Sequence, residues 1–151
     1  MSGRAAVATA NDGWSAGIRW MQEGSASELS LSGALGIGGV RVRSDGEAFT
    51  IDTSKGEHIE ASDAGAALAQ RIGVDLPVRN LRFWLLGVPA PQSTAVESLD
   101  ERGRLQELEQ DGWVSTFDKY ALHAGRWLPG RVQMTQGDYR IRVVVSRWQL
   151  E

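Results

Sequence analysis

Hydrophobic and polar residues alternate along much of this chain, and short turn sequences separate the alternating runs. The pattern is clearest in residues 14–20, 29–32, 40–43 and 140–145. A period of two with one polar face is typical of an antiparallel sheet that is solvated on one side. Between the runs stand residues that tolerate positive φ, as hairpin turns require, at 11–13, 44–46, 54–56, 111–112 and 136–138.

The middle of the chain departs from this alternation. Residues 62–72 place an apolar side chain at every fourth position, with a start signal at 62–63 and a stop signal at Gly73, and this predicts a helix. Residues 78–86 predict a second short helix, which is apolar on every side at its end and should be buried or face a ligand. The expected order is about six strands, two short helices, and about four or five further strands.

A glycine-rich stretch at 33–39 lies between two predicted strands. Its only large side chains are Leu35 and Ile37, which stand among Gly33, Gly36 and other small residues. Glycines give a leucine no local packing partner, so Leu35 is either folded back into the core or offered outward to something apolar. We interpret it as offered outward.

Composition narrows the function classes. With 151 residues the chain fits one domain, 1–151, and a net charge of −3 with interspersed signs argues against a nucleic-acid partner. The chain has no cysteine, which excludes disulfides, thiolate zinc sites and a cysteine nucleophile. The chain contains no run of eighteen apolar residues, so the sequence predicts no membrane-spanning helix. We expect a monomer.

No constellation for catalysis, metal binding or a cofactor stands out. His58 and His123 lie in polar, turn-like contexts without metal-ligand spacing, which favours ordinary surface histidines. The glycines at 36–39 lack the spacing of a phosphate-binding loop and precede a strand, not a helix. We therefore expect neither an enzyme nor a cofactor or metal site.

Six tryptophans are many for a chain of this length. Five of them come from distant apolar segments: Trp20, Trp84, Trp113, Trp127 and Trp148. Indole N–H groups need partners, so these rings suit a cavity for variable apolar ligands better than a compact core. Ordinary core packing remains open on composition alone.

A group of arginines falls on the predicted strands near the end of the chain. It comprises Arg126, Arg131, Arg140, Arg142 and Arg147. These side chains could favour an anionic surface such as phospholipid headgroups or an acidic partner. The alternative is a solvated outer face of the sheet.

Residues 76–89, Leu-Pro-Val-Arg-Asn-Leu-Arg-Phe-Trp-Leu-Leu-Gly-Val-Pro, resemble a hallmark of the LolB family of outer-membrane lipoprotein receptors. That family carries a short helix of the form L-P-x-x-x-L-R-x-W-x-L-G-x-P after a first lid helix. Further segments resemble the family in the same order: 3–7, 18–22, 99–105, 112–113, 128–132 and 141–148. The resemblance covers essentially the whole chain.

The resemblance implies a mainly β fold with short helices: a half-open antiparallel β-barrel of about ten or eleven strands, covered by a helical lid, as in LolA and LolB. Members accept acylated lipoproteins from the periplasmic carrier LolA and insert them into the inner leaflet of the outer membrane. The expected partners are therefore the acyl chains of lipoproteins, LolA and outer-membrane phospholipid. A soluble LolA-like carrier and a general apolar-ligand-binding envelope protein remain as alternatives.

The resemblance also implies two sites. The family has a protruding loop with an exposed leucine that inserts lipoproteins into the membrane, and Leu35 takes that place here, with Gly33, Gly36 and Ile37 around it. An acyl-chain cavity is expected between sheet and lid. We expect it to be lined by four tryptophans and three lid leucines: Trp20, Trp84, Trp113, Trp148, Leu68, Leu81 and Leu85.

Two features depart from the family. Members are anchored through the lipid on an N-terminal cysteine, and this chain has none. They also carry an N-terminal helix before the first strand, which this chain lacks or has lost. We therefore expect a soluble form of a protein that is normally lipid-anchored at the periplasmic face of the outer membrane; a naturally unanchored homologue is the alternative.

Overall fold

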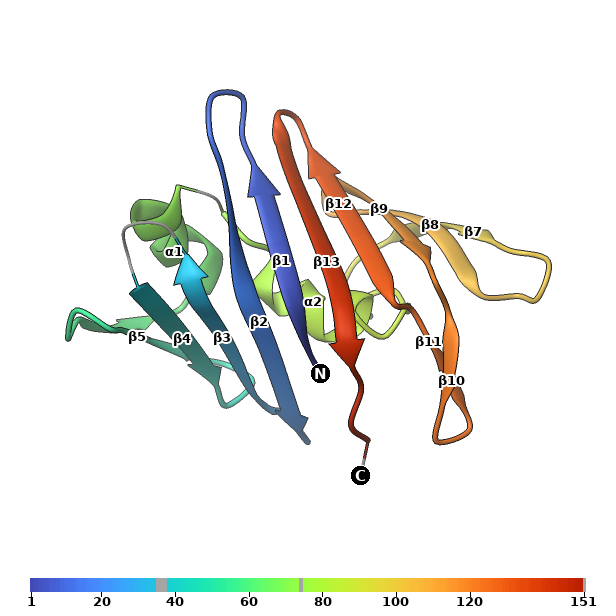
Figure 1. The fold of residues 1–151 in the computed structure, drawn as a ribbon, viewed down its shortest axis with the longest axis horizontal. Coiled ribbons are helices and arrows are strands. Elements are labelled where there is room, and N and C mark those ends of the chain that lie inside the picture. The colour runs from blue at the N-terminus through green and yellow to red at the C-terminus, as the bar shows by residue number, and fades with distance from the viewer. Residues whose placement is uncertain (35–37, 74, 151) are drawn as a thin grey trace.

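A computed structural model describes residues 1–34, 38–73 and 75–150 and shows two layers, a broad sheet and two helices that cover it (Figure 1). Before the helices come β1 (Ser2–Ala8), β2 (Gly13–Glu23), β3 (Ala26–Ala34), β4 (Gly38–Ser44), β5 (Phe49–Thr53) and β6 (His58–Ala61). The helices are α1 (Ala64–Ile72) and α2 (Val78–Trp84). After them come β7 (Ala95–Leu99), β8 (Leu105–Gln110), β9 (Trp113–Asp118), β10 (Ala121–His123), β11 (Arg126–Leu128), β12 (Arg131–Gln136) and β13 (Tyr139–Arg147).

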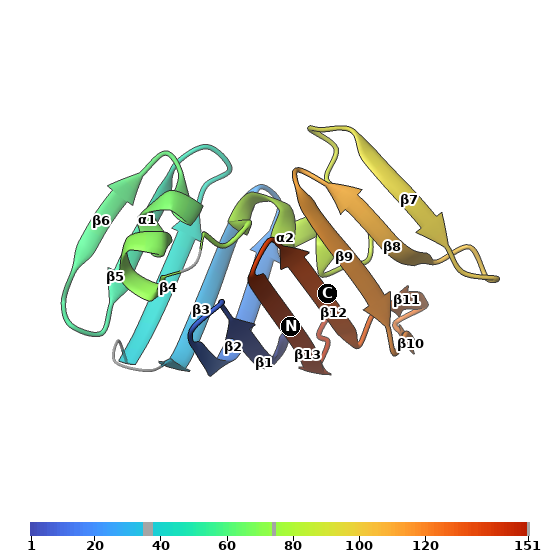
Figure 2. The same ribbon diagram turned by 90° about the horizontal axis from the view of Figure 1, so that it is seen from above.

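The large sheet is antiparallel throughout and does not close on itself. Its 11 strands run in the order β6-β5-β4-β3-β2-β1-β13-β12-β9-β8-β7, so β6 and β7 are its two edges. Figure 2 shows that the sheet bends into a trough and that both helices lie on the concave side. This confirms the predicted half-open barrel with a helical cover.

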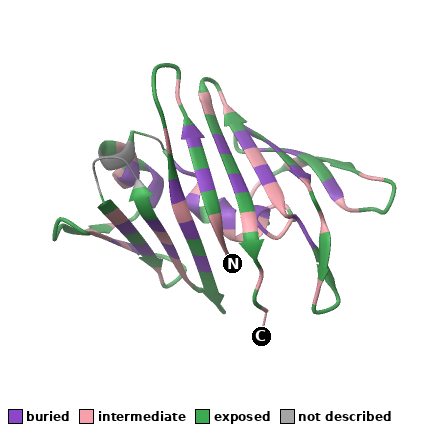
Figure 3. Cartoon of the chain, in the orientation of Figure 1, coloured by how far each residue is buried: buried purple, intermediate pink, exposed green. Residues whose placement is uncertain are grey.

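Burial alternates along the strands as the sequence pattern predicts (Figure 3). In β2 the buried residues are Ala16, Ile18 and Trp20, and in β13 they are Ile141 and Val143. These side chains face the helices and the intervening residues face solvent. The apolar core therefore lies between the concave face and the helical layer, as the period of two requires.

Both helices begin near the predicted positions. The Asp63 carboxylate accepts a hydrogen bond from the Ala66 backbone N–H (3.2 Å) and caps α1. The left-handed Gly73 (φ 78°) ends α1 by donating its N–H to the Ala69 carbonyl (3.0 Å).

The second helix ends two residues before the predicted boundary at Leu86. The Leu86 and Gly87 N–H groups donate to the Phe83 (3.0 Å) and Trp84 (2.9 Å) carbonyls, three residues back. This pattern tightens the chain beyond Trp84 into turns, so the apolar run at the end of the predicted helix is only partly helical.

The sequence pattern underestimates the number of strands after the helices. Among the described residues there are seven, because β10 and β11 form a separate two-stranded hairpin outside the large sheet. Its turn has Ala124 at φ 49° and Gly125 at φ 80°. Alanine rarely adopts positive φ, so the residues of this turn do not resemble a hairpin signal.

Candidate functional site

The predicted cavity residues lie in one apolar cluster between the sheet and the helices. Six of them are buried: Trp20, Trp84, Trp113, Leu68, Leu81 and Leu85. Trp148 is half-buried at the border of the cluster, and its indole N–H donates to the Pro129 carbonyl (3.2 Å). The chain therefore brings these residues together in one interior.

Most side chains of this interior are buried, and several of them are completely buried. The interior contains a cavity of about 20 Å³, which has room for about one water molecule. Of the seven residues expected to line a cavity, only Leu81 borders it. The other lining residues come from β1–β3, β12, β13 and the segment before α2: Ala5, Val7, Trp14, Ile18, Leu29, Leu31, Leu76, Met134, Ile141 and Val143.

Helix α2 is fastened to the sheet by a buried polar group that the sequence analysis did not single out. The Trp84 Nε1–H donates to the Gln110 Oε1 atom (2.9 Å). The same amide group accepts the Ala90 backbone N–H (2.9 Å) and donates to the Ala90 carbonyl (2.6 Å). The position of Gln110, two residues after the buried Leu108, already placed it on the inner face.

A second polar contact holds the start of α2. The Asn80 side-chain amide donates to the Asp111 carboxylate (2.8 Å) in the β8–β9 turn. Arg79 reaches in the other direction and donates to the Ser62 carbonyl (2.9 Å) just before α1. Its guanidinium also lies 4.9 Å from the centre of the Phe49 ring. Helix α2 is thus tied to β8 and to the β6–α1 connection.

The predicted loop at 33–39 is shorter than expected. Leu35, Gly36 and Ile37 lie outside the described residues, so their placement stays a prediction. Gly33 belongs to strand β3 and not to a loop, because β3 runs to Ala34. The pairing between β3 and β4 continues through a register shift, and the exposed Gly33 has φ 76° at that irregularity.

The base of this loop is braced by the β5–β6 turn. The Ser54 N–H donates to the Gly39 carbonyl (2.9 Å), and the Gly39 N–H donates to the Ser54 hydroxyl (3.0 Å). A Cβ atom at Gly38 (φ 73°) would collide with the Ser54 hydroxyl. The glycine-rich composition thus serves close approach at the loop base as well as turning.

Four of the five arginines near the end of the chain are exposed at the surface: Arg126, Arg140, Arg142 and Arg147. Arg131 is half-buried, and its guanidinium donates to both carboxylate oxygens of Asp118, with 2.7 Å for the Nε contact. These hydrogen bonds hold the pKa of the Asp118 carboxyl below its usual range.

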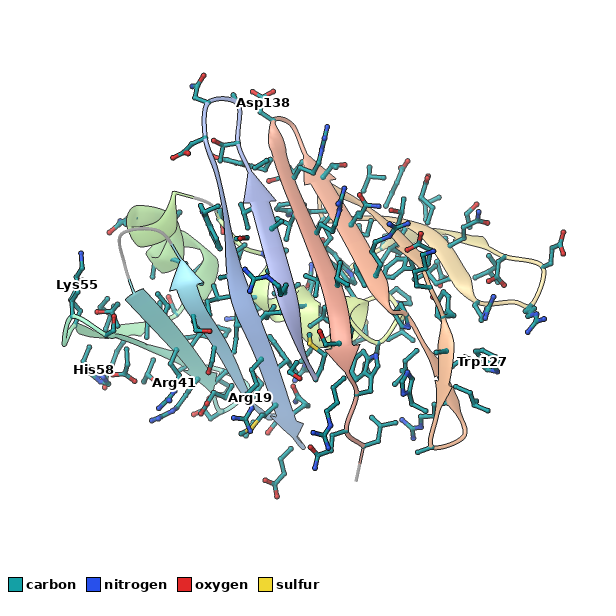
Figure 4. The ribbon with its side chains drawn as sticks, viewed as in Figure 1. Arg19, Arg41, Lys55, His58, Trp127 and Asp138 are labelled. Atoms are coloured by element: carbon teal, nitrogen blue, oxygen red, sulfur yellow. The ribbon has the colours of Figure 1, made fainter. Side chains whose placement is uncertain are left out.

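His58 has an acidic partner that sequence spacing did not indicate. It stands opposite Asp52 in the β5–β6 pairing, and its Nδ1 atom lies 2.5 Å from the Asp52 carboxylate. Figure 4 shows His58 at the margin of the molecule. The hydrogen bond to Asp52, together with the carboxylate charge, raises the pKa of His58. Both side chains are exposed, which agrees with the expected surface histidine.

We expect an NMR titration to give His58 a pKa above the ordinary value of about 6.5, and Asp52→Asn to return it to that value. While Asp52 is ionised, the pair contributes its full stability below the ordinary histidine pKa, and this contribution is lost as the pH rises through the raised pKa of His58. Unfolding midpoints of the native protein and Asp52→Asn should therefore converge as the pH rises through the raised pKa. A native His58 pKa at or below 6.5 would contradict the pairing.

Two further features are absent from the described part of the chain. No group of three or more histidine or acidic residues there could hold a metal ion. Within the same residues, no helix is long and apolar enough to span a bilayer.

Comparisons with known proteins agree with one another. The model of the family "Outer membrane lipoprotein LolB" matches residues 1–148. The outer-membrane lipoprotein LolB of Nitrosococcus oceani is 36% identical over 151 residues, which cover 99% of this chain and 75% of that protein. The outer-membrane lipoprotein LolB of Pseudomonas paraeruginosa is 34% identical over 149 residues, which cover 99% of this chain and 73% of that protein. A crystal structure of a LolA superfamily protein from Nitrosomonas europaea matches with a TM-score of 0.59 at 12% identity, over 99% of this chain and 85% of that one.

Proposed function

Because this chain belongs to the outer-membrane lipoprotein LolB family, we propose that it accepts acylated lipoproteins from the periplasmic carrier LolA. It then inserts them into the inner leaflet of the outer membrane. The observation that carries the proposal is the continuous apolar interior between the open sheet and its helical cover. Residues 1–151 act in this as one lipoprotein-binding domain at the periplasmic face of the outer membrane. They contain no cysteine that could carry a lipid anchor.

The interior suits an apolar cargo that must be released without an energy source. Each buried CH₂ group contributes about 0.8 kcal/mol, so a chain of about sixteen carbons gains on the order of 12 kcal/mol. Apolar contacts are non-directional and let the same surface accept different chains. Transfer from carrier to receptor to bilayer then runs downhill if each acceptor binds better than its donor, with about 1.4 kcal/mol for each tenfold bias.

Acyl chains enter this interior only if the helical layer moves, because the cavity of about 20 Å³ is far too small for one. Helix α2 is fixed to β8 through Trp84 and to the β8–β9 turn through Asn80, which favours movement elsewhere. The existing cavity lies where Leu76 and Leu81 meet the sheet. We place the acyl path at this seam, where Leu76 in the connection before α2 moves away from the sheet while the hydrogen bonds of Trp84 and Asn80 hold α2.

The proposal is tested by transfer of a labelled triacylated lipoprotein from LolA to this protein and then to liposomes. We expect the lipoprotein to leave LolA and appear in a complex with this protein, and to reach the liposomes faster than with LolA alone. Failure to take the lipoprotein from LolA would overturn the proposal. If the folded protein nevertheless bound an apolar fluorescent probe, a general apolar-ligand binder would be favoured instead.

A further inference from the structure

The β10–β11 hairpin stands outside the large sheet, beside the end of β13 (Figure 1). Ala121 pairs with Leu128, Leu122 with Trp127, and His123 with Arg126. Because side chains alternate along a strand, Leu122 and Trp127 share one face and their neighbours share the other. The two faces meet different surroundings.

One face of the hairpin borders a groove of about 390 Å³ against the end of β13. Its apolar lining comprises Ala121, Val144, Val145 and Trp148, and Val144 lies on the outward face of β13 next to the buried Val143. The Trp148 ring is held in place by its hydrogen bond to Pro129. The groove thus lies at the border of the apolar cluster, against which Val145 and Trp148 also pack, and shares no lining residue with the small interior cavity.

Apart from Gly130 and Ser146, the remaining lining residues carry cationic or imidazole side chains. Lys119, His123, Arg131 and Arg147 border the groove, and no described lining residue is acidic. Arg131 is paired with Asp118. Lys119 and Arg147 form no ion pair with any described residue. The Lys119 charge also acts on the Asp118 carboxylate, but neither cation is held in an ion pair with a described residue, so both can attract a negatively charged ligand.

The other face of the hairpin is apolar and exposed. Leu122 is 58% exposed and Trp127 is 46% exposed, and Figure 4 shows Trp127 at the outer margin of the molecule. The guanidinium groups of Arg102 and Arg104 lie 5.9 and 5.2 Å from the centre of the Trp127 ring. An exposed indole with aliphatic and cationic neighbours is typical of side chains at a membrane interface.

We propose that this groove binds an anionic phospholipid at the membrane surface. Lys119 and Arg147 hold the phosphate, while the ester region and the start of an acyl chain lie on Val144, Ala121 and Trp148. The volume is within the range of small-ligand sites. An acidic peptide would match the cations but would leave the apolar lining and the exposed Leu122 and Trp127 without partners, so the features together favour a lipid surface.

The test is sedimentation of the protein with vesicles, of phosphatidylcholine alone or of equal parts phosphatidylcholine and phosphatidylglycerol. We expect binding to the mixed vesicles to weaken about thirtyfold in Lys119→Asn/Arg147→Gln, from about fivefold for each basic residue at the surface. Asparagine suits position 119 because Lys119 has φ 56°. The matched control Arg140→Gln/Arg142→Gln removes the same charge from exposed positions of β13 outside the groove, and we expect it to weaken binding by less than about threefold.

A second measurement follows the Trp148 indole N–H by NMR, with Trp148→Phe to assign its signal. It should shift with monomeric dihexanoyl phosphatidylglycerol and not with inorganic phosphate. Equal losses in the two double variants would overturn the proposal, since diffuse surface charge would then explain binding. Equal binding to both kinds of vesicle, or a response of Trp148 to phosphate alone, would also overturn it. Neither measurement involves lipoprotein transfer, so the proposed function stands or falls separately.

Discussion

Trp84→Ala is expected to lower the free energy of unfolding by about 3–5 kcal/mol, the range for truncating a buried tryptophan. The Trp84 side chain is fully buried between α2 and the sheet, and its indole N–H is bonded to Gln110. Truncation removes the largest of the fully buried side chains and leaves a void in a densely packed interior. Urea unfolding followed by circular dichroism measures the change.

Two variants separate packing from hydrogen bonding in this prediction. Trp84→Phe keeps an aromatic ring but loses the contact to Gln110, and we expect about half the effect of alanine. Trp127→Ala removes the same side chain from an exposed position and should cost less than about 1 kcal/mol. If Trp84→Ala were no more harmful than Trp127→Ala, α2 would not be the fixed part of the helical cover.

Leu35→Glu is expected to slow delivery of lipoproteins to liposomes at least about tenfold, while folding and acceptance from LolA stay intact. This prediction rests on the proposed function and on an outward-facing Leu35. Burying one leucine in the bilayer contributes about 2 kcal/mol, too little to anchor the protein but enough to disturb the lipid packing locally. A glutamate at that position opposes insertion because its charge resists transfer into hydrocarbon. The delivery step of the transfer assay measures the loss.

Leu35→Phe is the matched control, because it keeps a large apolar side chain and should deliver at close to the native rate. The result distinguishes the two interpretations of the loop. If Leu35→Glu unfolds the protein, Leu35 belongs to the core. Native delivery by a folded Leu35→Glu variant would show that this side chain has no part in insertion.

The sequence predicts those parts of the fold that depend on local pattern. Alternation identifies β2 and β13, and the pair Asp63 and Gly73 marks both ends of α1, because caps and strand faces are encoded by neighbouring residues. The β10–β11 hairpin could not be predicted from the local pattern. Its turn holds Ala124 in a backbone conformation that alanine seldom adopts, and tertiary contacts must compensate for the strain.

The candidate site is less accessible from sequence. The tryptophans and leucines could be assigned to one interior because each lies on an apolar segment. The tightness of their packing could not be predicted from sequence, because it depends on side chains that meet from distant strands. The partner of Trp84 is likewise 26 residues away, in Gln110. Ser54 approaches the loop base because two turns lie side by side in space. The spacing of residues along the chain does not reveal this contact.

Under the proposed function, the small cavity of about 20 Å³ implies a threshold for ligands. Separating the helical cover from the sheet costs the same free energy whatever enters, and this cost is subtracted from the binding of every ligand. A single-chain amphiphile has only one set of CH₂ groups with which to offset it, at about 0.8 kcal/mol each. A cargo with three acyl chains brings about three times as many. Selectivity for multiply acylated molecules over ordinary detergents and fatty acids would then follow from the closed resting state, without any polar group that recognises them.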